Sequence, residues 1–487
     1  LHHVTMKFSD ETLTALLSAV EVISCPFIHL DEKEDDDDIL FFILIHYLSE
    51  QQPGRQKCRT SPSPRRAKQR VSWPQFMEMQ SDHHFRRMFR MPKGDFQLLC
   101  DTICSNVGSQ TFLPVSFIPN NTSQTRHCNK KVGGIIPGEM KVAIAIRMLA
   151  GASYLDLVPL FNVMTSYVFQ IFEDVLQWIL RTFEFPLLRW LCERNWKALE
   201  TLAADFAEKT AGVYYGPFGA LDGLALRIKS PSGVADPANY WCRKGFYAVN
   251  VQAIGDRHKR FLWCNPSHKG STHDSQAFDS SKLYELLTEM ADELEERGLF
   301  IVADSAYALS PFMQVPYDAN DIKGKDPENS KDAYNFYLSS CRIHIECAFG
   351  ELVGRFRIFW RTMKFNSLLK TCNVIKCTML LQNFIIEQRE KRQDKYSEET
   401  FFENMDVRPA DPQRTLNNST LEIPRPIVGD NNVPHPGGRP SESTVNFAKR
   451  GYDIRQALTI KLAMHNMKRP TYSNMRYNKY GHVYLVD

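Results

Sequence analysis

Three acidic residues, far apart in the chain, stand where hydrophobic segments are interrupted or end. Asp222 lies inside an apolar segment, and Asp304 ends the hydrophobic run Leu299–Ala303. Glu346 lies beside an apolar stripe with helical spacing. Converging carboxylates can hold two divalent ions roughly 4 Å apart, one at the attacking and one at the leaving oxygen of a phosphodiester. The chemistry to consider is therefore metal-dependent hydrolysis or transfer of a DNA phosphodiester bond.

The segments around these acids follow the order strand, strand, strand, helix, strand. We expect strands over Phe218–Ile228, Phe246–Ile254 and Phe261–Cys264, a helix over Ser275–Arg297 and a buried strand over Leu299–Ala303. This order is typical of an RNase H-like α/β fold, a mixed sheet flanked by helices. Its first and fourth strands are neighbours, so the two aspartates could share a metal ion.

The remaining acid needs a helix that crosses the sheet. The pattern predicts a helix from about Asp332 to Phe359, with apolar residues three or four positions apart, and another over Leu368–Arg389. Glu346 lies beside the apolar stripe of the first. It could instead only pair with Arg342 one turn earlier, a contact that contributes about 0.3 to 0.5 kcal/mol when exposed.

Five motifs in this region resemble, in order, the catalytic motifs of PIF/Harbinger transposases and the nucleases derived from them. They are Leu221-Asp222-Gly223, Trp241-Cys242-Arg243-Lys244-Gly245-Phe246-Tyr247, Lys269-Gly270-Ser271-Thr272-His273-Asp274-Ser275, Ala303-Asp304-Ser305-Ala306-Tyr307 and Ile345-Glu346-Cys347-Ala348-Phe349-Gly350. The resemblance covers roughly residues 214–362. Leu224 departs from the small polar residue that is common after the first Asp-Gly.

This resemblance implies a DDE triad of Asp222, Asp304 and Glu346 that binds two Mg²⁺ or Mn²⁺ ions and cleaves and transfers DNA strands. Asp274 would be an auxiliary metal ligand. It also implies a nuclear location and a partner of the Myb/SANT-like DNA-binding class, and a homo-oligomer is compatible with it. The alternatives are a host-adopted nuclease with the same triad and a DNA-binding protein that no longer cuts.

DNA contacts are expected from basic residues near the proposed site. These are Arg243, Lys244, Arg355, Arg357 and Arg361. Lysine and arginine neutralise DNA phosphates, although scattered surface charges need no such role.

Upstream, residues 73–206 have helical periodicity, with segments at Glu139–Ala150, Tyr154–Phe161 and Thr165–Ile179 that outline a helix-turn-helix. The presumed recognition helix carries Gln170, Glu173 and Asp174 and almost no basic residue, whereas reading of base edges needs basic or amide side chains. A structural helical bundle is therefore an equal alternative.

The composition sets the remaining limits. The 487 residues carry a net charge of only +3, so basic surface must come from local clusters. We divide the chain into a disordered region 1–72, a helical domain 73–206, a catalytic domain 207–390 and a flexible basic tail 391–487 with one helix at Asp453–Met467. The scattered cysteines predict neither disulfides nor structural zinc. The apolar segment 39–48 is too short for a membrane span.

Overall fold

The computed structural model describes residues 72–112, 136–232, 234–323, 326, 329–365, 367–392, 442–470, 475–477 and 483–485. The predictions of a disordered N-terminal region and of an apolar segment at 39–48 lie outside these residues, as does most of the predicted linker after residue 391. Within the described part, no single helix is long and apolar enough to cross a membrane. One bent pair, Tyr154–Phe161 with Thr165–Cys192, passes that test by length and composition alone.

Helices make up the N-terminal part of the described chain. They are α3 (Trp73–Met79), α4 (Asp82–Phe89), α5 (Lys93–Val107), α6 (Ser109–Phe112), α7 (Gly138–Leu149), α8 (Tyr154–Phe161) and α9 (Thr165–Thr182). A cluster of aromatic rings joins α3, α4 and α5, with Phe85, Phe89 and Phe96 fully buried. Their apolar residues belong to one continuous core with those of the sheet and its long helices.

The segment that resembled a recognition helix, α9, is held within this packing. It packs against α5, α7 and α8, and also against α17 (Leu368–Lys391). Glu173 of α9 forms a 2.8 Å ion pair with Lys370 of α17. Glu173 is therefore engaged within the protein, whereas Gln170 in the first half of α9 is exposed.

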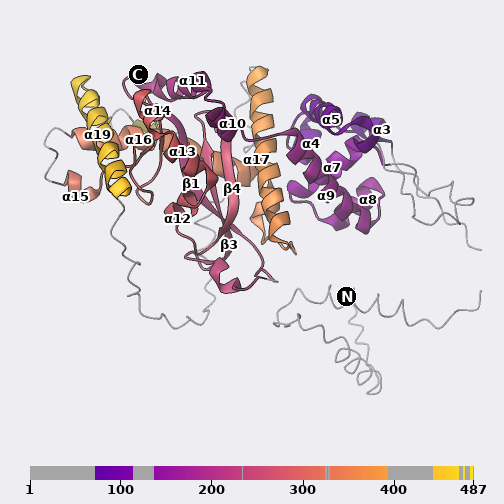
Figure 1. The fold of residues 1–487 in the computed structure, drawn as a ribbon. Helices are drawn as coiled ribbons and strands as arrows, with labels where there is room; N and C mark the ends of the chain where they lie inside the picture. Colours follow the sequence, from indigo (N-terminus) through magenta and orange to yellow (C-terminus); the bar gives the residue numbers. More distant parts are fainter. Residues whose placement is uncertain are drawn as a thin grey trace, which may run out of the picture. The chain divides into compact units, whose positions relative to one another are not determined.

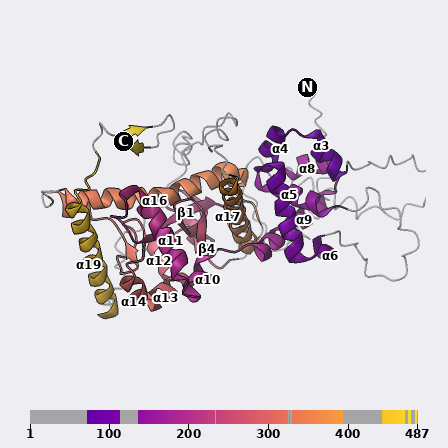
Figure 2. The same ribbon diagram turned by 90° about the horizontal axis from the view of Figure 1, so that it is seen from above.

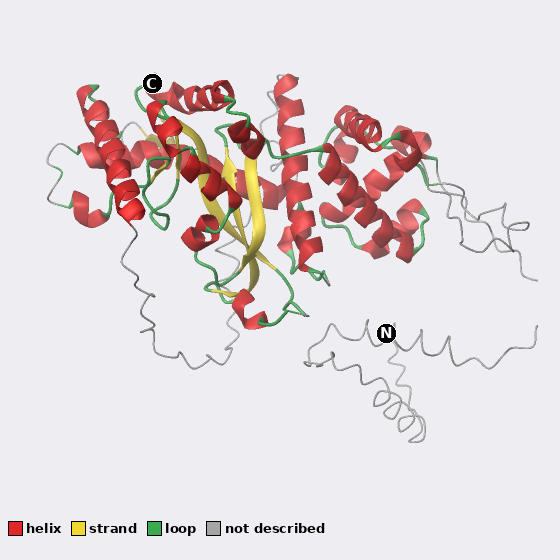
Figure 3. Ribbon diagram, viewed as in Figure 1, coloured by secondary structure: helices red, strands yellow, loops and turns green. Residues whose placement is uncertain are grey.

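The centre of the fold is a six-stranded mixed sheet with the strand order β2-β3-β1-β5-β6, and β4 pairs with β3 (Figure 3). Its strands are β1 (Pro217–Arg227), β2 (Trp241–Cys242), β3 (Phe246–Gly255), β4 (Phe261–Lys269), β5 (Phe300–Val302) and β6 (Met313–Gln314). β1 is antiparallel to β3 and parallel to β5. The expected RNase H-like sheet flanked by helices is thus confirmed.

Helices cover both faces of the sheet (Figures 1 and 2). The long helices α16 (Ser330–Arg355) and α17 share one hydrophobic core with Ala220 and Val302. The opposite core contains Leu221 and Ile301 together with five shorter helices. Those helices are α10 (Leu187–Cys192), α11 (Trp196–Ala207), α12 (Asp274–Asp279), α13 (Lys282–Glu289) and α14 (Ala291–Glu296). The helix expected over Ser275–Arg297 is therefore divided into three.

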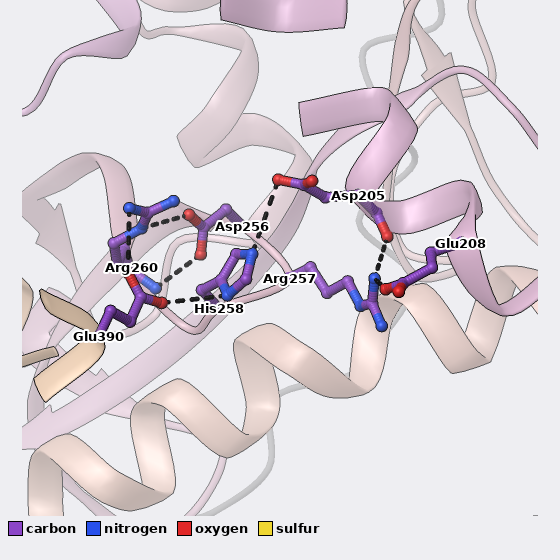
Figure 4. A network of polar contacts seen from close by, with 7 residues as sticks. All are labelled: Asp205, Glu208, Asp256, Arg257, His258, Arg260 and Glu390. Carbon is purple, nitrogen blue, oxygen red and sulfur yellow. Dashed lines mark hydrogen bonds and ion pairs between the residues drawn. The ribbon is translucent and has the colours of Figure 1, made fainter. Parts of the chain in front are cut away.

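The turn between β3 and β4 is fastened to helices on both sides by charged side chains (Figure 4). The fully buried carboxylate of Asp256 accepts a 2.7 Å hydrogen bond from Nε of Arg260. The ring of His258 lies 3.6 Å from Asp205 of α11 and 3.1 Å from Glu390 of α17. The antiparallel hairpin next to β1 is thereby tied to two helices.

A helix near the C-terminus, α19 (Glu442–Met464), packs against α16 and the edge strand β6. Leu462 is fully buried, and Arg450 forms ion pairs with Asp292 and Glu295 of α14. The sequence indicated one helix over Asp453–Met467 within a flexible tail. The helix instead starts about three turns earlier and covers the exposed edge of the sheet, because an open edge strand leaves backbone groups unpaired. A short hairpin, β7 (Met475–Tyr477) with β8 (Val483–Leu485), follows.

Candidate active site

The two predicted aspartates are brought level with each other by the register of β1 and β5. Ala220 pairs with Val302 in this parallel ladder. Asp222 lies two residues further along β1, so its side chain projects on the side of the sheet that α16 covers. Asp304 follows two residues after the end of β5, and its contact with Arg342 of α16 places it on the same side. The predicted adjacency of the first and fourth strands is confirmed.

Glu346 approaches from α16, whose apolar residues Ile345 and Phe349 are buried against the sheet. Arg342, one helical turn earlier, links the acids. Its Nη1 lies 3.6 Å from Oδ2 of Asp304, and its Nη2 donates a hydrogen bond to Oε1 of Glu346. The three acids therefore converge from β1, β5 and α16 around one guanidinium group.

Asp222 is the most enclosed of the three acids, and its environment shows that the others are close. The pKa of Asp222 is raised to about 6, chiefly by burial and also by the negative charges of Glu346 and Asp304. The backbone N–H of Gly223, which donates a 2.9 Å hydrogen bond to Oδ1, and the charge of Arg342 lower it. A carboxylate strained by burial and by two like charges is stabilised by a cation.

The structure places Asp274 on the other face of the sheet. Its Oδ1 accepts hydrogen bonds from the amides of Asn250 (2.9 Å) and Gln252 (3.0 Å). A Cβ atom at Gly223 would lie only 2.5 Å from the same oxygen. Since neighbouring residues of a strand point to opposite faces, Asp274 lies beneath β1 and Asp222 above it. The prediction of Asp274 as an auxiliary metal ligand is therefore not supported by this geometry.

Sequence reasoning missed the polar layer under β1. The buried amide of Gln252 donates to Asn250 and accepts a 2.6 Å hydrogen bond from the hydroxyl of Tyr307. This layer joins Asp274 to the loop that follows Asp304. The available signal was a pair of polar residues, Asn250 and Gln252, two positions apart in a buried strand, where unpaired polar groups are costly.

The donor set of three carboxylates fits a divalent cation such as Mg²⁺ or Mn²⁺, which prefers oxygen ligands. In the conformation described, however, the three side chains are not arranged around a common cation position. Among the residues that the structure describes, no three histidine, cysteine or acidic side chains are grouped so as to hold a metal ion. Arg342 lies against two of the three acids instead.

The residues proposed to contact DNA fall into two groups. Arg243, Lys244 and Arg361 are exposed, the first two in the turn between β2 and β3. Arg357 is half-buried, with its guanidinium 4.5 Å from the centre of the Trp360 ring. Arg355 is only 5 % exposed. It is withdrawn from the set, because a phosphate cannot reach a side chain buried in this way.

Residues 221–383 match the family model described as DDE superfamily endonuclease, and this segment contains all three acids. Residues 221–383 form a DDE superfamily endonuclease domain. The match confirms the resemblance seen in the five motifs.

The chain is also similar to the Arabidopsis thaliana protein named antagonist of like heterochromatin protein 1. The two are 25 % identical over 320 residues, which are 63 % of this chain and 74 % of that protein. No solved structure shows a significant match. The class of the DDE endonuclease domain thus rests on the family match.

Proposed function

We propose that this protein is a DNA endonuclease of the DDE type that cleaves phosphodiester bonds and transfers strands during transposition. Asp222, Asp304 and Glu346 would hold two Mg²⁺ or Mn²⁺ ions. The observation that carries the proposal is the shared register of β1 and β5, which puts two aspartates side by side under the helix that carries the glutamate. The DDE family match agrees with a DNA substrate.

The chain's own residues would prepare this reaction. Bound divalent ions supply the activation of water or a 3′-hydroxyl and the stabilisation of the leaving oxygen. The rigid β1–β5 pair fixes the two aspartates, and the buried face of α16 fixes Glu346. The exposed Arg243 and Lys244 would neutralise phosphates of the bound strand. A DNA substrate agrees with the proposed nuclear location, and a Myb/SANT-like partner or a second copy would supply sequence recognition.

A second candidate is a host-adopted role in chromatin. The name of the Arabidopsis relative describes antagonism of a heterochromatin protein, which favours this role over transposition for that relative. The three acids proposed as metal ligands are present in this chain under either role. The proposed nuclease activity therefore applies whether the protein transposes DNA or has been adopted by its host. It does not apply to the alternative of a protein that binds DNA without cutting it.

A nicking assay on supercoiled plasmid with Mg²⁺ or Mn²⁺ tests the proposal. We expect cleavage by the wild type and a loss of at least about 100-fold in Asp304→Asn, because even outer-shell changes at metal sites cost 10- to 100-fold. Asp318→Asn, an exposed acid without a side-chain capping bond, is the control and should retain full activity. Equal cleavage by the wild type and Asp304→Asn would refute the assignment.

A further inference from the structure

Arg342 contacts two acidic residues from different elements, whereas an ion pair on a helix surface joins residues of that helix alone. One contact is with Glu346 on its own helix, and the other is with Asp304 at the end of β5. Arg342 is 22 % exposed, whereas Asp304 and Glu346 are 40 % and 44 % exposed. The cation is therefore the more enclosed partner in both pairs, so the helix and sheet hold it between the acids.

The charge of Arg342 is permanent. Guanidinium groups are not deprotonated in proteins, so this position always carries one positive charge. The third acid also senses it, since Arg342 lowers the pKa of Asp222 against the opposing effects of burial and of Glu346 and Asp304. One fixed cation thus interacts with all three acids of the DDE endonuclease domain.

We propose that Arg342 is an internal counter-ion that competes with a divalent ion for Asp304 and Glu346. This inference rests on the proposed function. The guanidinium holds the acids together in the metal-free protein and must leave them before both can act as metal ligands. Its competition sets the divalent-ion concentration at which the site fills. The contacts of Arg342 explain why the three carboxylates lie near one another and yet, among the residues described, are not arranged to bind a metal ion.

The size of the effect follows from Coulomb's law. A unit positive charge about 5 Å from a divalent ion weakens binding by roughly 17-fold even in a medium as polar as water. Screening by salt reduces this value. Removal of the charge should therefore tighten metal binding by about tenfold.

The test is Mn²⁺ binding to the full chain in the absence of DNA, measured by titration calorimetry and by the EPR signal of free Mn²⁺. The variants are Arg342→Gln and Arg342→Lys. The matched control is Lys331→Gln, which removes a positive charge from the same helix about 16 Å away, at 1.5 Å of rise per residue. Circular dichroism establishes that each variant is folded.

We expect Arg342→Gln to bind Mn²⁺ about tenfold more tightly than the wild type. Arg342→Lys should fall between the two, because lysine keeps the charge and lacks the two-pronged geometry of arginine. Lys331→Gln should match the wild type. The gain should disappear when Asp304→Asn is added to Arg342→Gln.

Two results would overturn the inference, and they are distinguishable. If Arg342→Gln binds no more tightly than the wild type while Asp304→Asn still weakens binding, the metal site stands and the counter-ion role is wrong. If no Mn²⁺ binding depends on Asp304 in either the wild type or Arg342→Gln, the proposed function fails together with the inference.

Discussion

Asp222 illustrates how a functional carboxylate is maintained at a cost in stability. Its pKa is raised to about 6, first by burial and then by Glu346 and Asp304. The ordinary value for an aspartate is about 3.9. Between these two values the folded protein binds more protons at this site than the unfolded chain does. The free energy of unfolding therefore falls as pH rises from about 4 to about 6.

Asp222→Asn should remove this cost. In the presence of EDTA at pH 8 we expect the variant to be more stable than the wild type by about 1 to 2 kcal/mol, a value discounted for partial exposure. The gain should be much smaller at pH 4, where the aspartate is neutral in the folded state and about half neutral in the unfolded chain. Urea denaturation at the two pH values measures it. The burial argument would be contradicted if the difference in free energy of unfolding between Asp222→Asn and the wild type were smaller at pH 8 than at pH 4.

The sequence singled out all three acids, because each interrupts or borders a hydrophobic segment. Helical spacing also predicted that Glu346 could pair with Arg342, and the structure forms this pair. The sequence did not predict that Arg342 also contacts Asp304. The contact of Arg342 with Asp304 depends on the register between a helix and a strand end. The place of Asp274 depends on which face of β1 it approaches. Both are decided by three-dimensional pairing, which no local pattern encodes.

At the scale of elements, the β3–β4 hairpin positions β1 and is itself held by charged contacts. Asp256 is fully buried in its turn and depends on Arg260. Breaking a buried ion pair from one side leaves an uncompensated charge and costs about 3 to 5 kcal/mol. An exposed pair contributes far less, typically below about 1 kcal/mol.

Arg260→Leu should therefore lower the free energy of unfolding by about 3 to 5 kcal/mol in chemical denaturation. The control is Lys391→Leu. This substitution breaks the 2.7 Å ion pair between Lys391 and Glu387, whose side chains are 62 % and 50 % exposed, respectively. A loss below about 0.5 kcal/mol is expected there. Comparable losses in the two variants would show that the hairpin is not held in the way described.

The order of these elements was predictable and their breaks were not. The segments around Asp222 and Asp304 have alternating or continuous hydrophobic residues, and these patterns predict strands. The helix expected over Ser275–Arg297 divides at Ser281, whose side chain accepts a hydrogen bond from the N–H of Tyr284 and starts a new helix. A serine in a helical pattern is also compatible with an unbroken helix, so periodicity alone could not reveal the break.

At the scale of the whole molecule, α19 returns from far along the chain to cover the edge of the sheet. Gly451 lies against the loop before β6, where a Cβ atom would be within 2.9 Å of the Ser310 backbone. The side chain of Gln314 donates a 3.3 Å hydrogen bond to the carbonyl of Gly451. Such a long-range contact between a basic helix and an edge strand leaves no local signature, which is why the sequence indicated a tail.

Gly451→Ala should weaken this docking by about 1 to 3 kcal/mol, because the added methyl group meets rigid backbone. Thermal denaturation and the rate of proteolytic cleavage near residue 442 would measure the change. Met464→Ala, at an 80 % exposed position of the same helix, is the control and should change stability by less than about 0.5 kcal/mol. Resistance to protease equal to that of the wild type would argue against a docked α19.

The most direct test of the active site is anomalous diffraction from crystals of the full chain soaked in Mn²⁺. We expect Mn²⁺ peaks bounded by the carboxylates of Asp222, Asp304 and Glu346, with the guanidinium of Arg342 moved off Asp304. Peaks absent from this position at saturating Mn²⁺, or Mn²⁺ bound with any of the three acids turned away from it, would refute the assignment of the three acids as metal ligands.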